Sequence, residues 1–143
     1  MGFRPRTRST LRLKPVPSFL PMPRARFFFD AGSGGVLWPT GLQSQEAWGY
    51  PVRLERLPIR VALRDELTRL AEWYDASLNW DYPPDPGPWR EPECQAFNAA
   101  ARRALDQLRA ELGDGWVIAD EFEEVHDDPD LDRYLADPDN FRR

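Results

Sequence analysis

Two stretches of apolar residues at helical spacing place the strongest constraint on the fold of this chain. In the first, the apolar positions recur every three or four residues, at Leu63, Leu67, Leu70, Ala71, Tyr74 and Leu78. In the second, they are Phe97, Ala101, Ala104, Leu105, Leu108 and Leu112. Pro92 suits a first helical turn and Gly113 a helix end. The sequence therefore predicts two amphipathic helices, which we expect to be antiparallel neighbours because prolines interrupt the chain between them.

Short strand patterns flank the helical pair. Residues 26–30 form an aromatic run and residues 36–38 a second apolar run, with the glycine-rich stretch 31–35 between them. Glycines supply the positive φ angles of a tight turn, so these residues predict a β-hairpin. Residues 116–119 predict a further strand that extends toward Phe122. Between hairpin and helices, we expect a helical turn at 44–48 and an edge strand or turn at 50–54, where an edge tolerates Pro51.

The expected fold class is α+β, in the order ββααβ. A small antiparallel sheet, made of the N-terminal hairpin and the C-terminal strand, is covered on one face by the two antiparallel helices. A length of 143 residues fits one such domain. We place this domain at residues 26–122, between an N-terminal arm at 1–25 and a tail at 123–143.

Charge is distributed unevenly along the chain, whose net charge is −5. Residues 1–26 carry seven basic and no acidic side chains, whereas residues 119–143 carry ten acidic and three basic ones. The arm is also rich in proline, so we expect it to be disordered. Met22 directly precedes the first strand region, and the sequence leaves open whether it or Met1 is the natural start.

Composition also bears on location and cofactors. The single cysteine, Cys94, cannot form an internal disulfide, and we find neither a long apolar run nor a secretory signal. We therefore expect a cytoplasmic protein that does not contact a membrane. No motif predicts a cofactor.

Candidate chemical groups are sparse. The run Asp30-Ala-Gly-Ser-Gly-Gly lacks the Lys-Ser/Thr pair of a phosphate-binding loop and is better explained as a hairpin turn. The only histidine, His126, lies in an acidic tail, and Cys94 is better explained by packing near a helix start. Three aspartates near the inter-helix loop suggest a carboxylate or metal site, although their spacing matches no known loop motif; they are Asp75, Asp81 and Asp85.

The inter-helix stretch is the better candidate for function, because it interleaves aromatic residues, aspartates and prolines. Aromatic side chains on a proline-stiffened loop offer contact area with little entropy to lose. The predicted binding surface consists of Trp73, Trp80, Asp81, Tyr82, Asp85 and Trp89. The alternative is that the tryptophans fold back to cap the helical pair, and both arrangements can hold for different residues.

These observations favour an acidic protein-binding module, resembling immunity proteins or antitoxins in size and charge. An acidic surface suits a cationic protein partner because complementary charge speeds encounter. One alternative is a small carboxylate- or metal-dependent hydrolase or transferase. A second is a regulator that binds nucleic acid through the basic arm, since the acidic body itself repels phosphate. The sequence does not fix the oligomeric state.

Overall fold

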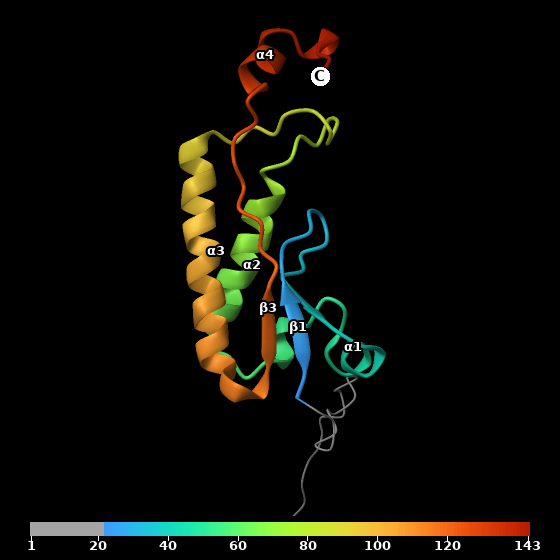
Figure 1. Cartoon of the computed structure of the whole chain (residues 1–143), viewed down its shortest axis with the longest axis vertical. Helices are drawn as coiled ribbons and strands as arrows, with labels where there is room; N and C mark the ends of the chain where they lie inside the picture. Colours follow the sequence, from blue (N-terminus) through green and yellow to red (C-terminus); the bar gives the residue numbers. More distant parts are fainter. Residues whose placement is uncertain (1–21) are drawn as a thin grey trace, which may run out of the picture.

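A computed structural model describes residues 22–143 and shows a small three-stranded sheet packed against two long helices (Figure 1). The predicted α+β class is thus confirmed, whereas the arm, up to residue 21, lies outside the described residues. The strands are β1 (Arg24–Phe27), β2 (Leu37–Pro39) and β3 (Val117–Asp120). The helices are α1 (Leu42–Trp48), α2 (Val61–Asp75), α3 (Glu91–Leu112) and α4 (Leu131–Ala136). Short 3-10 turns lie at Leu54–Arg56, Gly113–Gly115 and Pro138–Asn140.

The sheet has the order β2-β1-β3 and is mixed, so the prediction of a wholly antiparallel sheet is wrong. β1 and β2 form the expected antiparallel hairpin, in which Arg26 lies opposite Trp38. β3 instead pairs with β1 in parallel, with Ala25 opposite Ile118. The cause is the number of times the chain reverses direction after β1. It reverses into β2, again into α2, again into α3 and again into β3, so after four reversals β3 runs in the same direction as β1 (Figure 1).

The two helices lie antiparallel beside each other, as predicted. Most of the expected stripe residues are buried, including Leu63, Leu67 and Leu70 on α2 and the whole predicted set on α3. α3 has Pro92 in its first turn and is followed by Gly113 as its C-cap, whose φ of 58° favours glycine. α2 ends at Asp75, before the predicted Leu78, so the inter-helix connection begins earlier than the apolar pattern indicates.

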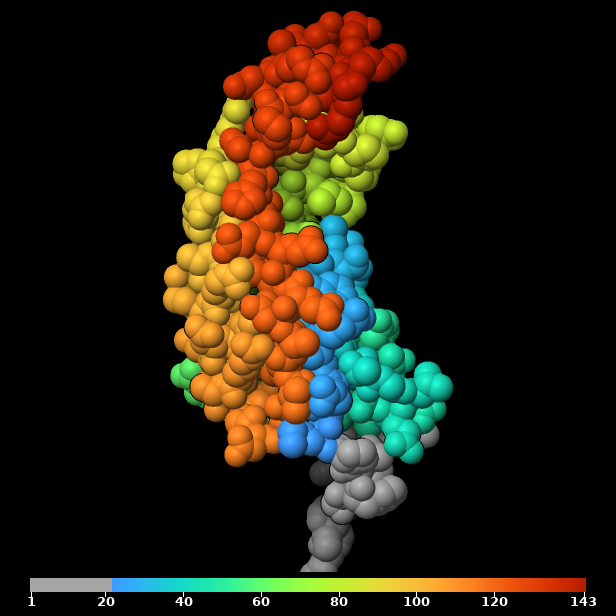
Figure 2. Space-filling model, viewed as in Figure 1, coloured from blue at the N-terminus to red at the C-terminus, as the bar shows by residue number. Residues whose placement is uncertain are grey.

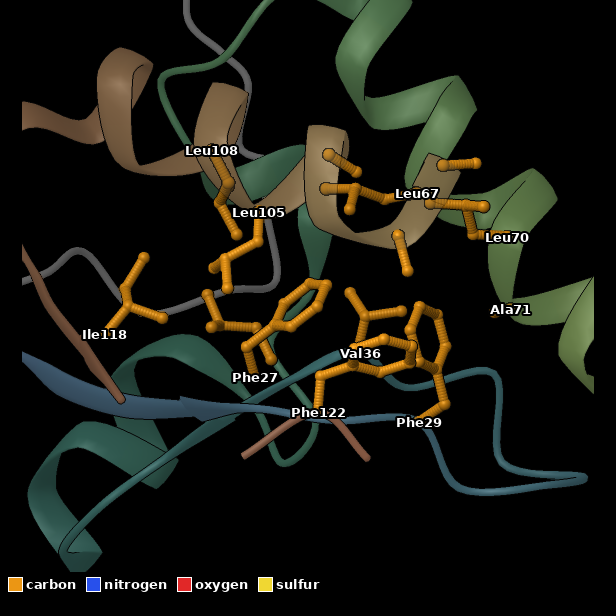
Figure 3. Close-up of a cluster of buried hydrophobic side chains, with 14 of the residues drawn as sticks. Phe27, Phe29, Val36, Leu67, Leu70, Ala71, Leu105, Leu108, Ile118 and Phe122 are labelled. Atoms are coloured by element: carbon orange, nitrogen blue, oxygen red, sulfur yellow. The ribbon is translucent and has the colours of Figure 1, made fainter. Parts of the chain in front are cut away.

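The core lies between the helical pair and one face of the sheet (Figure 3). Phe27 and Ile118 come from the strands, and they meet leucines from both helices, among them Leu67 and Leu108. Phe29 and Phe122 extend this layer beyond the strand ends toward the inter-helix loop. The β1–β3 pair therefore positions the residues that follow each strand, 28–30 and 121–123, next to each other.

The opposite face of the hairpin is covered by aromatic rings. Trp38 stacks on Phe28 with ring centroids 5.0 Å apart and meets Tyr50 at 5.1 Å. A Cβ atom at Gly35 would lie 2.6 Å from the Trp38 ring, so only glycine permits this packing. The edge strand expected at 50–54 is absent from the described structure. After the Val52 N–H donates one hydrogen bond to the Leu37 carbonyl (2.8 Å), the chain turns into the 3-10 turn at Leu54–Arg56.

Residues after β3 run along α3 and end against the inter-helix loop (Figure 1). The buried Asn98 side chain holds them: its amide donates to the Val125 carbonyl (2.8 Å) and its oxygen accepts from the Val125 N–H (2.9 Å). Farther along, Leu131 and Phe141 are buried. Within residues 22–143, the structure contains no helix long and apolar enough to cross a membrane.

Candidate binding surface

Two of the six residues of the predicted binding surface point into the protein. Trp89 is buried and Trp73 is half-buried, and both rings lie about 5.3 Å from the ring of Phe97. The indole N–H of Trp73 donates to the Glu93 carboxylate at 2.7 Å. These two tryptophans close the end of the core where α2 finishes and α3 begins. For them, the alternative that the tryptophans fold back to cap the helical pair holds.

Three other residues of that set face solvent. Trp80 and Tyr82 are 57% and 58% exposed, and Asp81 is exposed between them. Their backbone is fixed by Asn79, whose side-chain oxygen accepts hydrogen bonds from the N–H groups of residues 81 and 82 and whose amide donates to the carbonyl of Pro86 (3.1 Å). The sequence analysis overlooked Asn79, although asparagine in a proline-rich turn is a recognisable signal.

Asp85, the sixth residue, lies half-buried on the side of the loop that faces the C-terminal segment. There it lines a pocket of about 370 Å³ together with Trp89, His126 and Arg143. The Arg143 guanidinium binds Asp128 at 2.8 Å and the carbonyl of Pro84 at 2.8 Å. This pairing lowers the pKa of the Asp128 carboxyl below its ordinary value. The C-terminal segment therefore covers this side of the loop and leaves the Trp80 side open.

The exposed Trp80 joins the inter-helix loop to the β-hairpin. Its indole N–H donates to the backbone carbonyl of Asp75 at 2.7 Å, and a Cβ atom at Gly32 would lie 3.6 Å from its ring. The Asp75 carboxylate in turn accepts a hydrogen bond from the Gly32 N–H at 2.8 Å. The glycine-rich hairpin turn is thus braced against the end of α2 by Asp75, which is the role of this carboxylate in the structure.

Next to this junction lies a pocket of about 310 Å³ between the hairpin and the residues that follow β3, two segments that adjoin on one face of the molecule (Figure 2). We call it the acidic pocket; it is lined by Arg26, Phe28, Phe29, Tyr74, Glu121, Phe122 and Glu123. The wider surface that combines it with the Trp80 junction is called the hairpin face, with the residues Asp30, Tyr74, Asp75, Trp80, Glu121 and Glu123. Of these, Glu121 and Glu123 were missed as site residues, although the acidic and aromatic run 120–124 was visible in the sequence.

The pKa of Tyr74 reflects the negative charge around the acidic pocket. Its half-buried phenol has a pKa above the ordinary value, first because of burial and then because of the nearby carboxylates of Asp30, Glu123 and Asp75. The negative potential at this point disfavours a second anion and favours a cation.

This raised pKa predicts a pH effect on stability. Because the folded state holds the Tyr74 proton more tightly than the unfolded state, the stabilisation is complete below the ordinary tyrosine pKa of about 10 and is lost as the pH rises through the folded-state pKa. We expect Tyr74→Phe to show a shallower loss of stability above pH ~10 than the wild type. Urea unfolding midpoints across this range measure the effect, and parallel curves for the two proteins would contradict it.

Two backbone groups at the edge of the sheet next to this face already have side-chain hydrogen-bond partners. The guanidinium of Arg109 on α3 donates to the Ile118 carbonyl at 2.6 Å, and Asp120 accepts a hydrogen bond from the Phe122 N–H at 3.1 Å. These contacts occupy backbone groups that an added strand would need. These contacts make the edge of β3 less favourable for an added strand than the side chains of the hairpin face are for a partner.

The environments of Cys94 and His126, two residues considered for catalysis, do not favour a reactive role. Burial, followed by nearby acidic groups, raises the pKa of the Cys94 thiol, which disfavours the reactive thiolate. His126 is exposed, with Nδ1 3.2 Å from the Glu91 carboxylate. Within residues 22–143, no three His, Cys, Asp or Glu side chains are grouped closely enough to hold a metal ion. The hypothesis of nucleic-acid binding through the arm falls outside the described residues and stays a prediction.

A match to a protein-family model shows the family to which this chain belongs. Residues 35–120, which run from the end of the hairpin turn through β3 and make up more than half of the chain, match the family described as Serratia CdiI immunity protein-like. The chain belongs to this family. Membership supports the immunity-like, protein-binding role expected from size and charge. No curated protein matches the sequence.

The matched region of this immunity protein-like chain includes both layers of the fold. It holds α2, the inter-helix loop and α3, and therefore Tyr74, Asp75 and Trp80 of the hairpin face. Asp30 precedes the match, and Glu121 and Glu123 follow it directly. Half of the residues of the hairpin face thus lie inside the matched region, and the three that lie outside it are all acidic.

Proposed function

We propose that this chain is an immunity protein that binds and neutralises a cationic protein toxin through its hairpin face, in the cytoplasm. The observation that carries the proposal is an open acidic and aromatic surface on a member of an immunity protein-like family. Immunity by binding requires no catalytic group in the chain. It requires a surface that a toxin recognises strongly and selectively.

Charge supports a basic partner. Residues 22–143 contain 24 acidic side chains and 14 arginines, and at least seven of these arginines already pair with carboxylates inside the protein. Acidic groups are therefore in excess at the surface, and on the hairpin face Asp30 and Glu123 have no ion-pair partner among the described residues. Complementary charge accelerates association and rejects acidic competitors.

Aromatic exposure supports a contact point at Trp80. A large ring that is more than half exposed, yet held by a hydrogen bond to Asp75, loses little conformational entropy on binding. Tryptophan is enriched among the residues that contribute most to protein interfaces. Of the residues predicted from sequence, Trp80 belongs to the hairpin face, and Asp81 and Tyr82 are exposed beside it. Asp85 lies on the side of the loop that the C-terminal segment covers, and Trp73 and Trp89 support the surface from inside.

The test uses a basic toxin domain chosen, from a panel of cationic protein toxins, because the wild-type chain protects cells against it. We expect Trp80→Ala to weaken the complex at least tenfold. Glu123→Arg is expected to slow association, most strongly at low salt. Calorimetry and stopped-flow binding measure these effects, and growth of cells that express the toxin reports protection.

Matched controls lie at the far end of α2. Asp65→Arg makes the same kind of charge change as Glu123→Arg at an exposed site, and Val61→Ala removes an exposed apolar side chain. Both are expected to bind and protect like the wild type. If the wild-type chain protected cells against no toxin of the panel, or if all four variants bound the chosen toxin equally well, the proposal would be wrong.

A further inference from the structure

The acidic pocket has the size, walls and charge of a receptor for one side chain. We propose that it receives an arginine side chain of the protein partner, with the guanidinium between Glu121 and Glu123 and against the ring of Tyr74. This inference rests on the proposed function and names the group that the hairpin face recognises. It is drawn from four features of the pocket: its unpaired charge, its aromatic walls, its volume and the arginine already at its rim.

Charge within the pocket is only partly neutralised. Glu121 pairs with Arg26 at 3.4 Å, which is a long contact, whereas Glu123 has no ion pair within residues 22–143. Asp30 and Asp75 add to the negative potential at the Tyr74 phenol. An entering cation therefore meets one free carboxylate and a second that is weakly held.

Aromatic rings make up the walls, and the structure shows that guanidinium groups pack against them. Arg26 lies over the ring of Phe28, 5.1 Å from its centroid, and Arg102 lies over Phe122 at 5.2 Å. Both rings line the pocket. A planar guanidinium combines such packing with hydrogen bonds to carboxylates in its own plane.

Shape and hydration favour arginine over other cations. A volume of about 310 Å³ exceeds that of a bare metal ion and accommodates a side chain. A lysine ammonium is compact and strongly hydrated, so it gains less from aromatic walls than arginine does. The pocket thus favours a guanidinium over an ammonium group.

Arg26 gives the proposal a distinctive prediction. Its guanidinium contacts Glu121 and also donates to the Tyr50 hydroxyl at 3.5 Å, and because Arg26 lines the pocket it places positive charge next to Glu121. If an arginine of the partner enters, Arg26 repels it and competes for Glu121. Removal of Arg26 is then expected to tighten binding, whereas removal of Glu123 is expected to weaken it.

The experiment titrates the folded full chain with acetyl-arginine amide and follows backbone amide signals by NMR. A single side chain is expected to bind in the millimolar range, with shifts concentrated at residues 26–30 and 121–123. We expect Glu123→Gln to weaken binding about threefold and Arg26→Gln to strengthen it about twofold, as suits exposed charge pairs. Asp65→Asn serves as the charge-matched control, and acetyl-lysine amide is expected to bind at least about threefold more weakly.

Several results would overturn the proposal: shifts spread over the surface, equal binding of the two amides, or equal effects of Glu123→Gln and Asp65→Asn. Arg26→Gln weakening the complex would do so as well. The probe does not depend on the toxin, so the two proposals fail separately. Toxin binding without pocket shifts would overturn the arginine site alone, and pocket shifts without toxin protection would overturn the proposed function alone.

Discussion

Replacing Phe97 with alanine is expected to lower the free energy of unfolding by about 3–5 kcal/mol, the largest effect of any single substitution considered. Phe97 is fully buried at the centre of an aromatic cluster. Its neighbours are Phe29, Trp73, Tyr74, Trp89 and Phe122, with ring centroids 5.2 to 6.1 Å away. Truncation removes apolar burial and leaves a cavity that five rings cannot fill without moving.

The matched control is Phe141→Ala. Phe141 is also buried, but its ring packs against one aromatic ring, that of Tyr134, and against arginine side chains in the C-terminal segment. We expect a loss below about 2 kcal/mol there, because fewer buried contacts are removed. Chemical denaturation followed by tryptophan fluorescence and by circular dichroism measures both variants. Equal losses would show that the Phe97 cluster is not the centre of the core.

The Phe97 cluster also shows what sequence patterns reveal here. Spacing along α3 identified Phe97 as a buried position, because a helix that packs on a sheet repeats its apolar contacts every three or four residues. The same rule contained a signal for Trp73, three residues after Leu70. Trp89 carried no such signal, since it precedes α3, and only the path of the loop brings it over Phe97. Periodicity describes regular elements and not the chain between them.

The direction of β3 is a second feature that sequence patterns do not predict. The apolar run at 116–119 indicated a strand, and the structure confirms it as β3, but a run of this kind is compatible with either edge of a sheet and either direction. Its parallel pairing with β1 follows from the number of reversals and from α3, whose 22 residues span about 33 Å and return the chain to the start of β1. Local patterns do not contain that information.

The candidate site shows the same division between local and distant information. Exposure of Trp80 and Tyr82 agrees with a loop that lacks helical periodicity. The acidic pocket, in contrast, joins Arg26 and Phe28 to Glu121 and Glu123, which lie more than 90 positions later in the chain. The parallel pairing of β1 with β3 makes them neighbours, and the sequence pattern alone does not predict that pairing.

One buried polar residue, Asn98, anchors the chain just after that pocket, and its replacement is the second large expected effect. Asn98→Ala is expected to lower the free energy of unfolding by about 2–3 kcal/mol, because it leaves the N–H and the carbonyl of Val125 without their partners. Asn98 is the buried contact by which α3 holds the segment that carries Glu121 and Glu123, in addition to the exposed pairs of Arg102 with Asp120 and Glu124. Hydrogen exchange of residues 121–127 is therefore expected to rise more than exchange in α2.

Loss of this anchor should also reduce toxin affinity beyond what global stability accounts for, because the two glutamates no longer hold one position and binding must order them. Affinity is best measured well below the melting temperature, where the variant is fully folded. Asn140→Ala is the control: within residues 22–143 its side chain bonds only to Asp137, at an exposed turn, and we expect a change within about 0.5 kcal/mol. Unchanged exchange in residues 121–127 of Asn98→Ala would mean that contacts of Val125 and Phe122 with the core suffice to hold the segment, and that the acidic pocket is preformed without Asn98.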